Sequence, residues 1–170
     1  MTLGLYGGSF NPPHTGHVGA AAEAIKTLRL DRLIWMPSGD PPHKTLPEET
    51  PSPAHRLAMS RLAAAGLRGA EVSAFELDGG ARYTVDTVRM LLEREKPEKL
   101  YLLMGSDQWE VFPTWRQADE LLKLCEPYIF PRTPVSSTEI RAQLREGRGK
   151  ELLTPGVYDY IRSEGLYGNP

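Results

Sequence analysis

Short apolar runs recur along the chain and are separated by longer stretches in which apolar residues follow a helical period. Five of these runs have the length of a strand and lie close to glycine or proline, which favours strand over buried helix. They occupy residues 3–6, 33–36, 71–75, 100–104 and 128–130. The run at 100–104 is the clearest, because it ends directly before Gly105. We therefore expect five short, largely buried strands.

The stretches between and after these runs carry helix signals. We expect helices over residues 18–28, 53–65, 84–95 and 155–163. The first is rich in alanine, a strong helix former. Two others begin at a hydroxyl residue followed by proline, Ser52-Pro53 and Thr154-Pro155, which is typical of an N-cap and the first helical position. Gly165 follows the last helix and is expected to end it.

Strands that alternate with helices are typical of βαβ units, which build a parallel sheet through right-handed crossovers. We therefore expect an α/β fold of three layers, with helices on both faces of one parallel sheet. The pattern is helical only over residues 135–170, which predicts a small C-terminal helical part. A chain of 170 residues fits one domain over 1–170. The proline-rich stretch 37–53 predicts a long loop, and such loops are often functional.

Composition narrows the function classes. The net charge of −2 gives no sign of the basic balance that long nucleic acids require. The single cysteine, Cys125, excludes an intramolecular disulfide, and no apolar stretch is long enough to cross a bilayer. The N-terminus has no secretory pattern. We therefore expect a cytoplasmic protein that binds neither nucleic acid nor membrane, and small anionic ligands remain open because a few donors suffice for them.

The first strand is followed by the string GGSFNPPHTGH at residues 7–17 and then by a helix. The glycines allow a ligand to approach the backbone closely and expose its N–H groups. The helix N-terminus adds partial positive charge, which suits phosphate. His14 and His17 lie three residues apart at that N-terminus and can donate hydrogen bonds. This string therefore predicts a phosphate site.

Three other interpretations of the string fail on spacing. The dinucleotide fingerprint G-x-G-x-x-G is absent. The hydrolase pattern G-x-S-x-G is also absent, because Asn11 stands where its second glycine would be. A zinc site would need further ligands beyond His14 and His17, and besides carboxylates the chain offers only His43, His55 and Cys125. We therefore expect no protein-built metal site.

Several segments of the sequence resemble those of a known family. Residues 7–17 resemble the HxGH signature of the adenylyltransferases, and residues 135–141, VSSTEIR, resemble their second signature with one conservative change. The segments 83–87, YTVDT, and 105–115 resemble two further elements of the bacterial nicotinate-nucleotide adenylyltransferases. The resemblance covers nearly the whole chain. It implies a Rossmann-like fold and transfer of AMP from ATP to nicotinate mononucleotide, giving nicotinate adenine dinucleotide and pyrophosphate in NAD biosynthesis.

The resemblance also implies three groups of site residues. The catalytic residues are expected to be His14, His17 and Arg141. ATP is expected to contact Gly7, Gly8, Ser9, Phe10, Gly105, Asp107, Ser136, Ser137 and Thr138. The mononucleotide is expected to contact Thr84, Trp115, Arg116, His43 and Lys44. The partners are thus ATP and nicotinate mononucleotide.

The implied reaction needs no general base. The phosphate of the mononucleotide is already mostly ionised near neutral pH, because its second pKa is about 6. The protein then has to position the phosphates and neutralise their charge. Mg²⁺ is expected as the cofactor, bound mainly through ATP phosphates, since it keeps most of its waters and needs few protein ligands.

Each assigned residue also has a purely structural interpretation. Ser136 and Glu139 fit a capping box, Thr84 and Asp107 fit helix caps, Trp115 fits a core position, and His43 and Lys44 fit a solvated loop. His55 and Arg56 lie on an expected helix, and we interpret them as structural or solvated.

Two rival functions remain open, and so does the oligomeric state, a homo-oligomer included. One rival is a related adenylyltransferase that acts on phosphopantetheine, and the other is a non-catalytic nucleotide-binding module. The chain also departs from the family in one place. Residues 125–134 form a very short connection, which predicts a reduced fifth-strand region and a more open edge of the site.

Overall fold

The computed structural model describes residues 1–42 and 45–170. Five parallel strands form one sheet in the order β3-β2-β1-β4-β5. The strands are β1 Thr2–Gly8, β2 Arg32–Pro37, β3 Ala70–Val72, β4 Lys99–Gly105 and β5 Glu126–Phe130. The helices are α1 Thr15–Thr27, α2 Pro53–Ala64, α3 Thr84–Glu95, α4 Ser106–Val111, α5 Ala118–Leu124, α6 Ser137–Arg145 and α7 Pro155–Glu164. The expected parallel α/β fold is confirmed.

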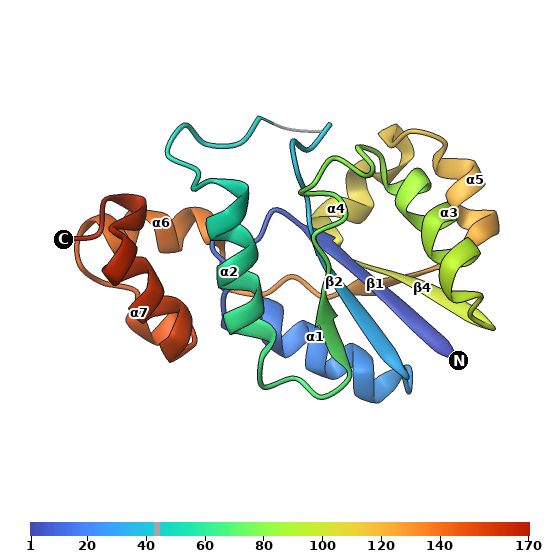
Figure 1. Ribbon diagram of the computed structural model, residues 1–170, viewed down its shortest axis with the longest axis horizontal. Helices are drawn as coiled ribbons and strands as arrows, with labels where there is room; N and C mark the ends of the chain where they lie inside the picture. Colours follow the sequence, from blue (N-terminus) through green and yellow to red (C-terminus); the bar gives the residue numbers. More distant parts are fainter. Residues whose placement is uncertain (43–44) are drawn as a thin grey trace.

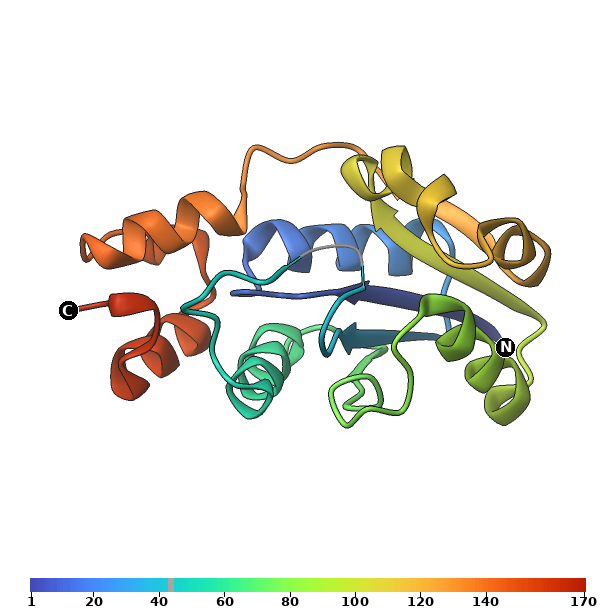
Figure 2. The same cartoon turned by 90° about the horizontal axis from the view of Figure 1, so that it is seen from above.

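Side chains alternate between the two faces of the sheet, and each face has its own core. Tyr6, Leu33 and Trp35 face the helices α1 and α2 and the C-terminal helical part. Leu5 and Ile34, their neighbours along β1 and β2, face α3 and α5. In Figure 1, α2 and α7 lie on one side of the strands and α3 and α5 on the other, and Figure 2 shows the same arrangement from above. The three layers predicted from the sequence are therefore present.

Most helix ends follow the predicted local signals. Ser52 caps α2 by accepting a hydrogen bond from the His55 N–H, and Gly165 ends α7 with a φ of 63°. The hydroxyl of Ser136 accepts from the Glu139 N–H and caps α6, as the capping pattern predicted. α3 has the bounds that the apolar period gave.

Two strands differ from the expectation. The third strand covers Ala70–Val72 instead of 71–75, because the chain turns into a loop at Ser73, whose side chain accepts a hydrogen bond from the Phe75 N–H. The fifth strand is longer than expected and covers Glu126–Phe130, where five residues pair with β4. The short connection therefore does not shorten the strand. It shortens the segment after it, because only residues 131–136 separate β5 from α6.

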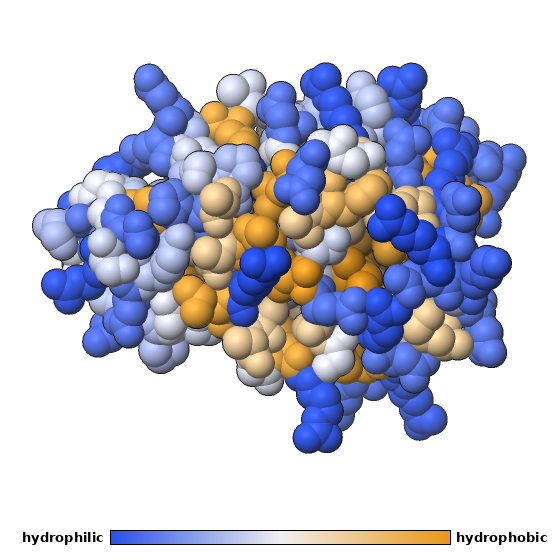
Figure 3. Space-filling view, in the orientation of Figure 1, coloured by the Kyte–Doolittle hydropathy of each residue, from blue (hydrophilic) through white to orange (hydrophobic). Residues whose placement is uncertain are grey.

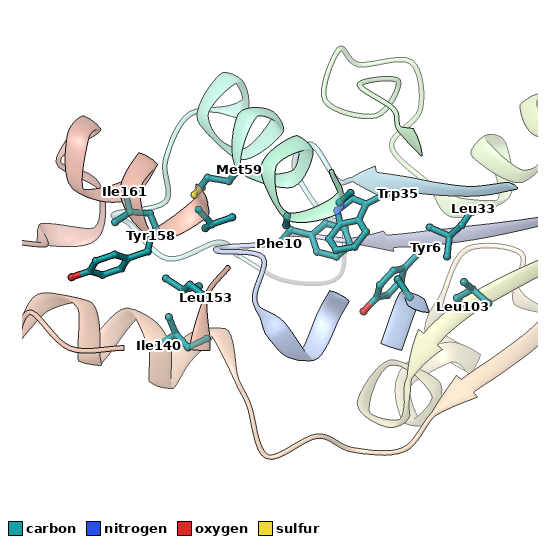
Figure 4. Close-up of a cluster of buried hydrophobic side chains, with 14 of the residues drawn as sticks. Tyr6, Phe10, Leu33, Trp35, Met59, Leu103, Ile140, Leu153, Tyr158 and Ile161 are labelled. Carbon is teal, nitrogen blue, oxygen red and sulfur yellow. The ribbon is translucent and has the colours of Figure 1, made fainter. Parts of the chain in front are cut away.

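The C-terminal helical part packs beside α2. α7 contacts α2, and Ile140, Leu153 and Ile161 join the same core as Met59. Figure 4 shows these side chains together with Phe10, Trp35 and Tyr6 at the end of the sheet. In the space-filling view, apolar surface gathers at the centre of the face that Figure 1 presents, and hydrophilic residues surround it (Figure 3).

Candidate active site

The first cavity opens beyond the carboxyl ends of β1 and β4 and has a volume of about 560 Å³. This is the edge at which open α/β sheets bind ligands. Every residue expected to be catalytic or to contact ATP lines it. These residues are Gly7, Gly8, Ser9, Phe10, His14, His17, Gly105, Asp107, Ser136, Ser137, Thr138 and Arg141. The fold thus brings the two signatures together, although more than a hundred residues separate them.

The two histidines hold each other in one tautomer. His14 Nδ1 accepts hydrogen bonds from the N–H groups of Gly16 and His17, at 3.0 and 3.3 Å. His17 Nδ1 accepts from the His14 N–H at 3.1 Å, and the two rings stack with centroids 3.7 Å apart. A nitrogen that accepts carries no proton, so each ring holds its proton on Nε2. The pair therefore offers two N–H donors on residues that line the cavity.

Burial keeps the first histidine uncharged. His14 is 5% exposed, and desolvation lowers its pKa to about 4. Its side chain also serves as the N-cap of α1, and its backbone N–H donates the return bond to the His17 side chain. The pair is thus built into the helix end that provides the partial positive charge. Near neutral pH, His14 can therefore donate a hydrogen bond but carries no positive charge.

The second signature is tied directly to the first. Arg141 donates from Nη1 to the Asn11 carbonyl at 2.7 Å and from Nη2 to the Thr138 hydroxyl at 3.2 Å. Ser137 donates its hydroxyl to the Pro12 carbonyl at 3.0 Å. Burial lowers the pKa of Arg141, and its guanidinium lines the first cavity. The α6 N-terminus and Arg141 therefore line the same cavity as the histidine pair.

Asn11 connects three parts of the chain, and sequence reasoning missed this role. Its Nδ2 donates to the Thr50 hydroxyl at 2.9 Å, and its Oδ1 accepts from the Tyr167 hydroxyl at 2.5 Å. Its carbonyl accepts from Arg141. Both Asn11 and Tyr167 are buried. Its place inside the first signature was the only sequence signal, because no local pattern shows a hydrogen bond to a residue 156 positions away.

Arg56 fixes the backbone of the glycine turn through hydrogen bonds to carbonyl groups. It is 2% exposed and donates to the carbonyls of Ser9, Ser38 and Gly39. These carbonyls follow β1 and β2, so one guanidinium fixes the chain beyond two neighbouring strands. The sequence suggested a structural or solvated arginine, and the structure shows the structural role. His55 lies on the same helix and bonds to the Tyr160 hydroxyl at 2.7 Å.

A second cavity of about 530 Å³ lies beside the first and is more apolar. Its lining includes Thr84 and Trp115, as expected for the mononucleotide, and the unexpected Glu76. Thr84 is the first residue of α3, and Trp115 is half-buried against Phe112. The two cavities share lining residues, namely Gly7, Gly8, Ser9, Asp107 and Gln108. A ligand in one can therefore meet a ligand in the other at the glycine turn.

The remaining expected residues have different placements. The guanidinium of Arg116 lies 4.6 Å from the Tyr83 ring centroid, and Arg116 does not line either cavity described here. His43 and Lys44 lie outside the described residues. Phe10 lines the first cavity, but its ring is buried and stacks on Trp35, which leaves its backbone for a ligand.

Asp107 stands where the two cavities meet. It lines both and forms an ion pair with Arg132, from the segment after β5. Both side chains are largely exposed. Within residues 1–42 and 45–170, no group of three or more histidine, cysteine or acidic side chains could hold a metal ion. Among these same residues, no helix is long and apolar enough to cross a membrane.

Comparison with known proteins agrees with this geometry. The cytidylyltransferase-like family matches residues 5–143. A probable nicotinate-nucleotide adenylyltransferase of Synechococcus sp. is 34% identical over 198 aligned positions, covering 99% of this chain and 95% of the relative. One from Gemmatimonas aurantiaca is 36% identical, covering 98% and 92%. The alignments exceed the 170 residues of this chain, so these relatives carry additional residues.

Solved structures share the fold. The nicotinic acid mononucleotide adenylyltransferase of Plasmodium falciparum in complex with NaAD superposes with a TM-score of 0.79 at 18% identity, covering 99% of this chain and 98% of that one. The family match over most of the chain and the full-length relatives above 30% identity agree with the two signatures in the first cavity. The chain therefore belongs to the cytidylyltransferase-like family and, within it, to the nicotinate-nucleotide adenylyltransferases.

Proposed function

We propose that the chain binds ATP in the first cavity and nicotinate mononucleotide in the second, and joins them at the glycine turn that both cavities share. The observation that carries this assignment is the shared lining at Gly7, Gly8 and Ser9, beside the Nε2–H donors of His14 and His17. Two phosphate groups that must react can meet only where the two cavities join.

The reaction is an in-line displacement at phosphorus. An oxygen of the mononucleotide phosphate forms a bond to the α-phosphorus of ATP. The bond from that phosphorus to the oxygen bridging to the β-phosphate breaks, and pyrophosphate leaves with the electron pair. The attacking oxygen is already ionised near neutral pH. The protein therefore contributes position and charge stabilisation.

Each donor has a distinct part in this proposal. The Nε2–H groups of His14 and His17 donate to the phosphate oxygens as charge shifts toward the leaving group. The α1 N-terminus adds partial positive charge on the same side. Arg141 and the α6 N-terminus act from the second signature, where a fixed guanidinium suits phosphate oxygens.

The site fits Mg²⁺ held by substrate more than Mg²⁺ held by protein. The described lining of the first cavity offers one carboxylate, Asp107, and it is paired with Arg132. Mg²⁺ accepts such a site because it keeps its waters and takes phosphate oxygens as ligands. When bound, it would neutralise the phosphate charge of ATP and pyrophosphate.

The second cavity suits a pyridine mononucleotide. Trp115 offers a flat face for the pyridine ring, and Thr84 offers a hydroxyl at the start of α3, where the helix end favours an anion. We propose that these groups favour the nicotinate carboxylate over the carboxamide.

The hydrogen bonds from Arg141 and Tyr167 to Asn11 support a single domain over 1–170.

A pyrophosphate-release assay with ATP and a panel of acceptors tests the function. We expect release with nicotinate mononucleotide, slower release with the amide and no release with phosphopantetheine. Product analysis should show nicotinate adenine dinucleotide in equal amount to pyrophosphate. Faster turnover of phosphopantetheine would assign the related activity, and no turnover with any acceptor would assign a binding module. Either result would overturn the proposal.

A further inference from the structure

A half-buried carboxyl group, that of Glu76, lines the second cavity. Glu76 lies in the loop between β3 and α3, and its Oε2 accepts a hydrogen bond from the Thr87 hydroxyl at 2.8 Å. Thr87 is fully buried, and its bond to the half-buried Glu76 is partly buried. A Cβ placed at Gly39 would lie 2.8 Å from the Glu76 carbonyl, so the loop after β2 packs tightly against this segment. Glu76 is therefore held between that loop and α3.

This carboxyl lies close to the expected contact for the pyridine substituent. Thr84 and Thr87 are three residues apart on α3, and residues at that spacing are neighbours on one helix face. Thr87 bonds Glu76, and Thr84 lines the same cavity as Glu76. The geometry thus puts a carboxyl and a hydroxyl at one end of the cavity, with Trp115 also in the lining.

Both charge states of this carboxyl are accessible near neutral pH. Burial raises the pKa of Glu76 to about 7, and the hydrogen bond from Thr87 opposes the rise. Among the described residues, the other charged groups lining this cavity are Asp40, Arg82 and Asp107, and Asp107 is paired with Arg132. On α3, Asp86 and Arg89 pair with each other. Desolvation, not a neighbouring charge, is therefore the main cause.

We propose that Glu76 is a specificity-determining residue of the second cavity, which selects between an anionic and an uncharged substituent on the pyridine ring of the acceptor. Its neutral carboxyl donates an O–H to the nicotinate carboxylate. Its ionised carboxylate repels that group and accepts an N–H from a carboxamide. The proposal rests on the proposed function, because it concerns the acceptor of the same reaction.

The preference for acid over amide then falls as pH rises. The carboxylate of nicotinate is ionised throughout this range, and the phosphate of the acceptor titrates alike in both substrates. ATP ionisation is also common to both. A change with pH in the ratio of kcat/KM for the acid to kcat/KM for the amide therefore comes from groups in the second cavity.

The test is this ratio, measured from about pH 6 to about pH 8.5. We expect it to fall by about thirtyfold from loss of the neutral form, because the neutral fraction of a group with a pKa of about 7 falls by that factor, and by up to about 300-fold where the amide is accepted only by the ionised form. Glu76→Gln should abolish the dependence, since an amide offers a permanent N–H donor and does not titrate. The ratio should then stay at its high, acid-preferring value at every pH.

Thr87→Val is the matched second variant. It keeps the shape of a buried side chain but removes the hydroxyl that lowers the Glu76 pKa. The midpoint of the pH dependence should therefore move to higher pH, a shift that a merely structural role of Thr87 would not produce. Glu93→Gln, on the exposed side of α3, should leave both the ratio and its midpoint unchanged.

The outcomes separate this proposal from the proposed function. A constant ratio in the natural protein would overturn the role of Glu76 while leaving adenylyl transfer intact. An unchanged pH dependence in Glu76→Gln, or an unmoved midpoint in Thr87→Val, would do the same. Absence of turnover with both acceptors would instead overturn the proposed function itself.

Discussion

The two cavities differ in how their polar groups are held. In the first, most of the polar groups come from two continuous strings, and several of them bond to one another, as Arg141 to Asn11 and His14 to His17. Neither His14 nor Arg141 changes its charge near neutral pH, because the pKa of His14 is lowered and arginine stays charged. In the second, side chains from four separate segments meet, and Glu76 titrates near neutral pH. Turnover and acceptor choice are thus assigned to different parts of the site.

The largest effect on turnover is expected from a substitution in the first cavity. His17→Ala removes one Nε2–H donor to the transferring phosphate. Loss of such a donor typically costs about 3–4 kcal/mol, or several hundredfold in kcat. Steady-state kinetics with both substrates saturating measure it. His55→Ala is the control, because His55 bonds Tyr160 and lines neither cavity. Normal turnover of a folded His17→Ala protein would contradict the role.

Arg141→Ala tests whether the first cavity binds ATP and not the acceptor. Hydrogen bonds to a charged group are worth roughly 1.5–3 kcal/mol, so KM for ATP should rise by about 10- to 100-fold. KM for the acceptor should change much less. Arg145→Ala, one turn along α6 and paired with Glu49, is the matched control. Equal effects on the two KM values would mean that Arg141 acts on the whole fold instead.

The lowered pKa of His14 makes the free energy of unfolding depend on pH in the acid range. Its pKa is lowered to about 4 in the folded chain, so the unfolded chain takes up a proton first as pH falls below about 6.5. The free energy of unfolding should therefore fall between about pH 6.5 and pH 4, by about 2 kcal/mol at pH 5. His14→Asn keeps a cap acceptor and does not titrate. Urea titrations at both ends of this range should show a smaller decrease in the variant.

Tyr167→Phe loosens the connection between the C-terminus and the first signature. It leaves the buried Oδ1 of Asn11 without its donor, which costs about 1–2 kcal/mol of the unfolding free energy. We also expect a lower kcat/KM for ATP, since Asn11 holds Arg141. Tyr160→Phe, whose hydroxyl bonds His55, controls for loss of a tyrosine hydroxyl elsewhere. Unchanged kinetics with reduced stability would limit Tyr167 to folding.

The smallest effect is expected at the second cavity. Trp115→Ala removes a stacking face worth about 0.5–1.5 kcal/mol, so KM for nicotinate mononucleotide should rise by about two- to tenfold. KM for ATP should stay nearly constant. Trp109→Ala tests specificity, because Trp109 stacks on Phe112 but does not line the cavity. A larger rise in KM for ATP would move Trp115 to the ATP side.

The sequence by itself determined the architecture and most of the first cavity. Apolar period, N-caps and terminal glycines are local signals, and they predicted the bounds of α3, the start of α7 and the presence of five parallel strands, although β3 and β5 have other bounds than expected. The first cavity was predictable because its lining comes largely from two strings whose residues stay together in the fold. The end of β3 was missed because a local turn at Ser73 competes with strand pairing.

Only the tertiary structure decided which polar groups meet inside the protein. Asn11 with Tyr167, Arg56 with Ser9, and Glu76 with Thr87 are pairs without a local signal. The physical reason is that these bonds depend on burial and on long-range contact. Burial gives Glu76 a pKa of about 7, and a sequence shows the carboxyl but not its loss of water.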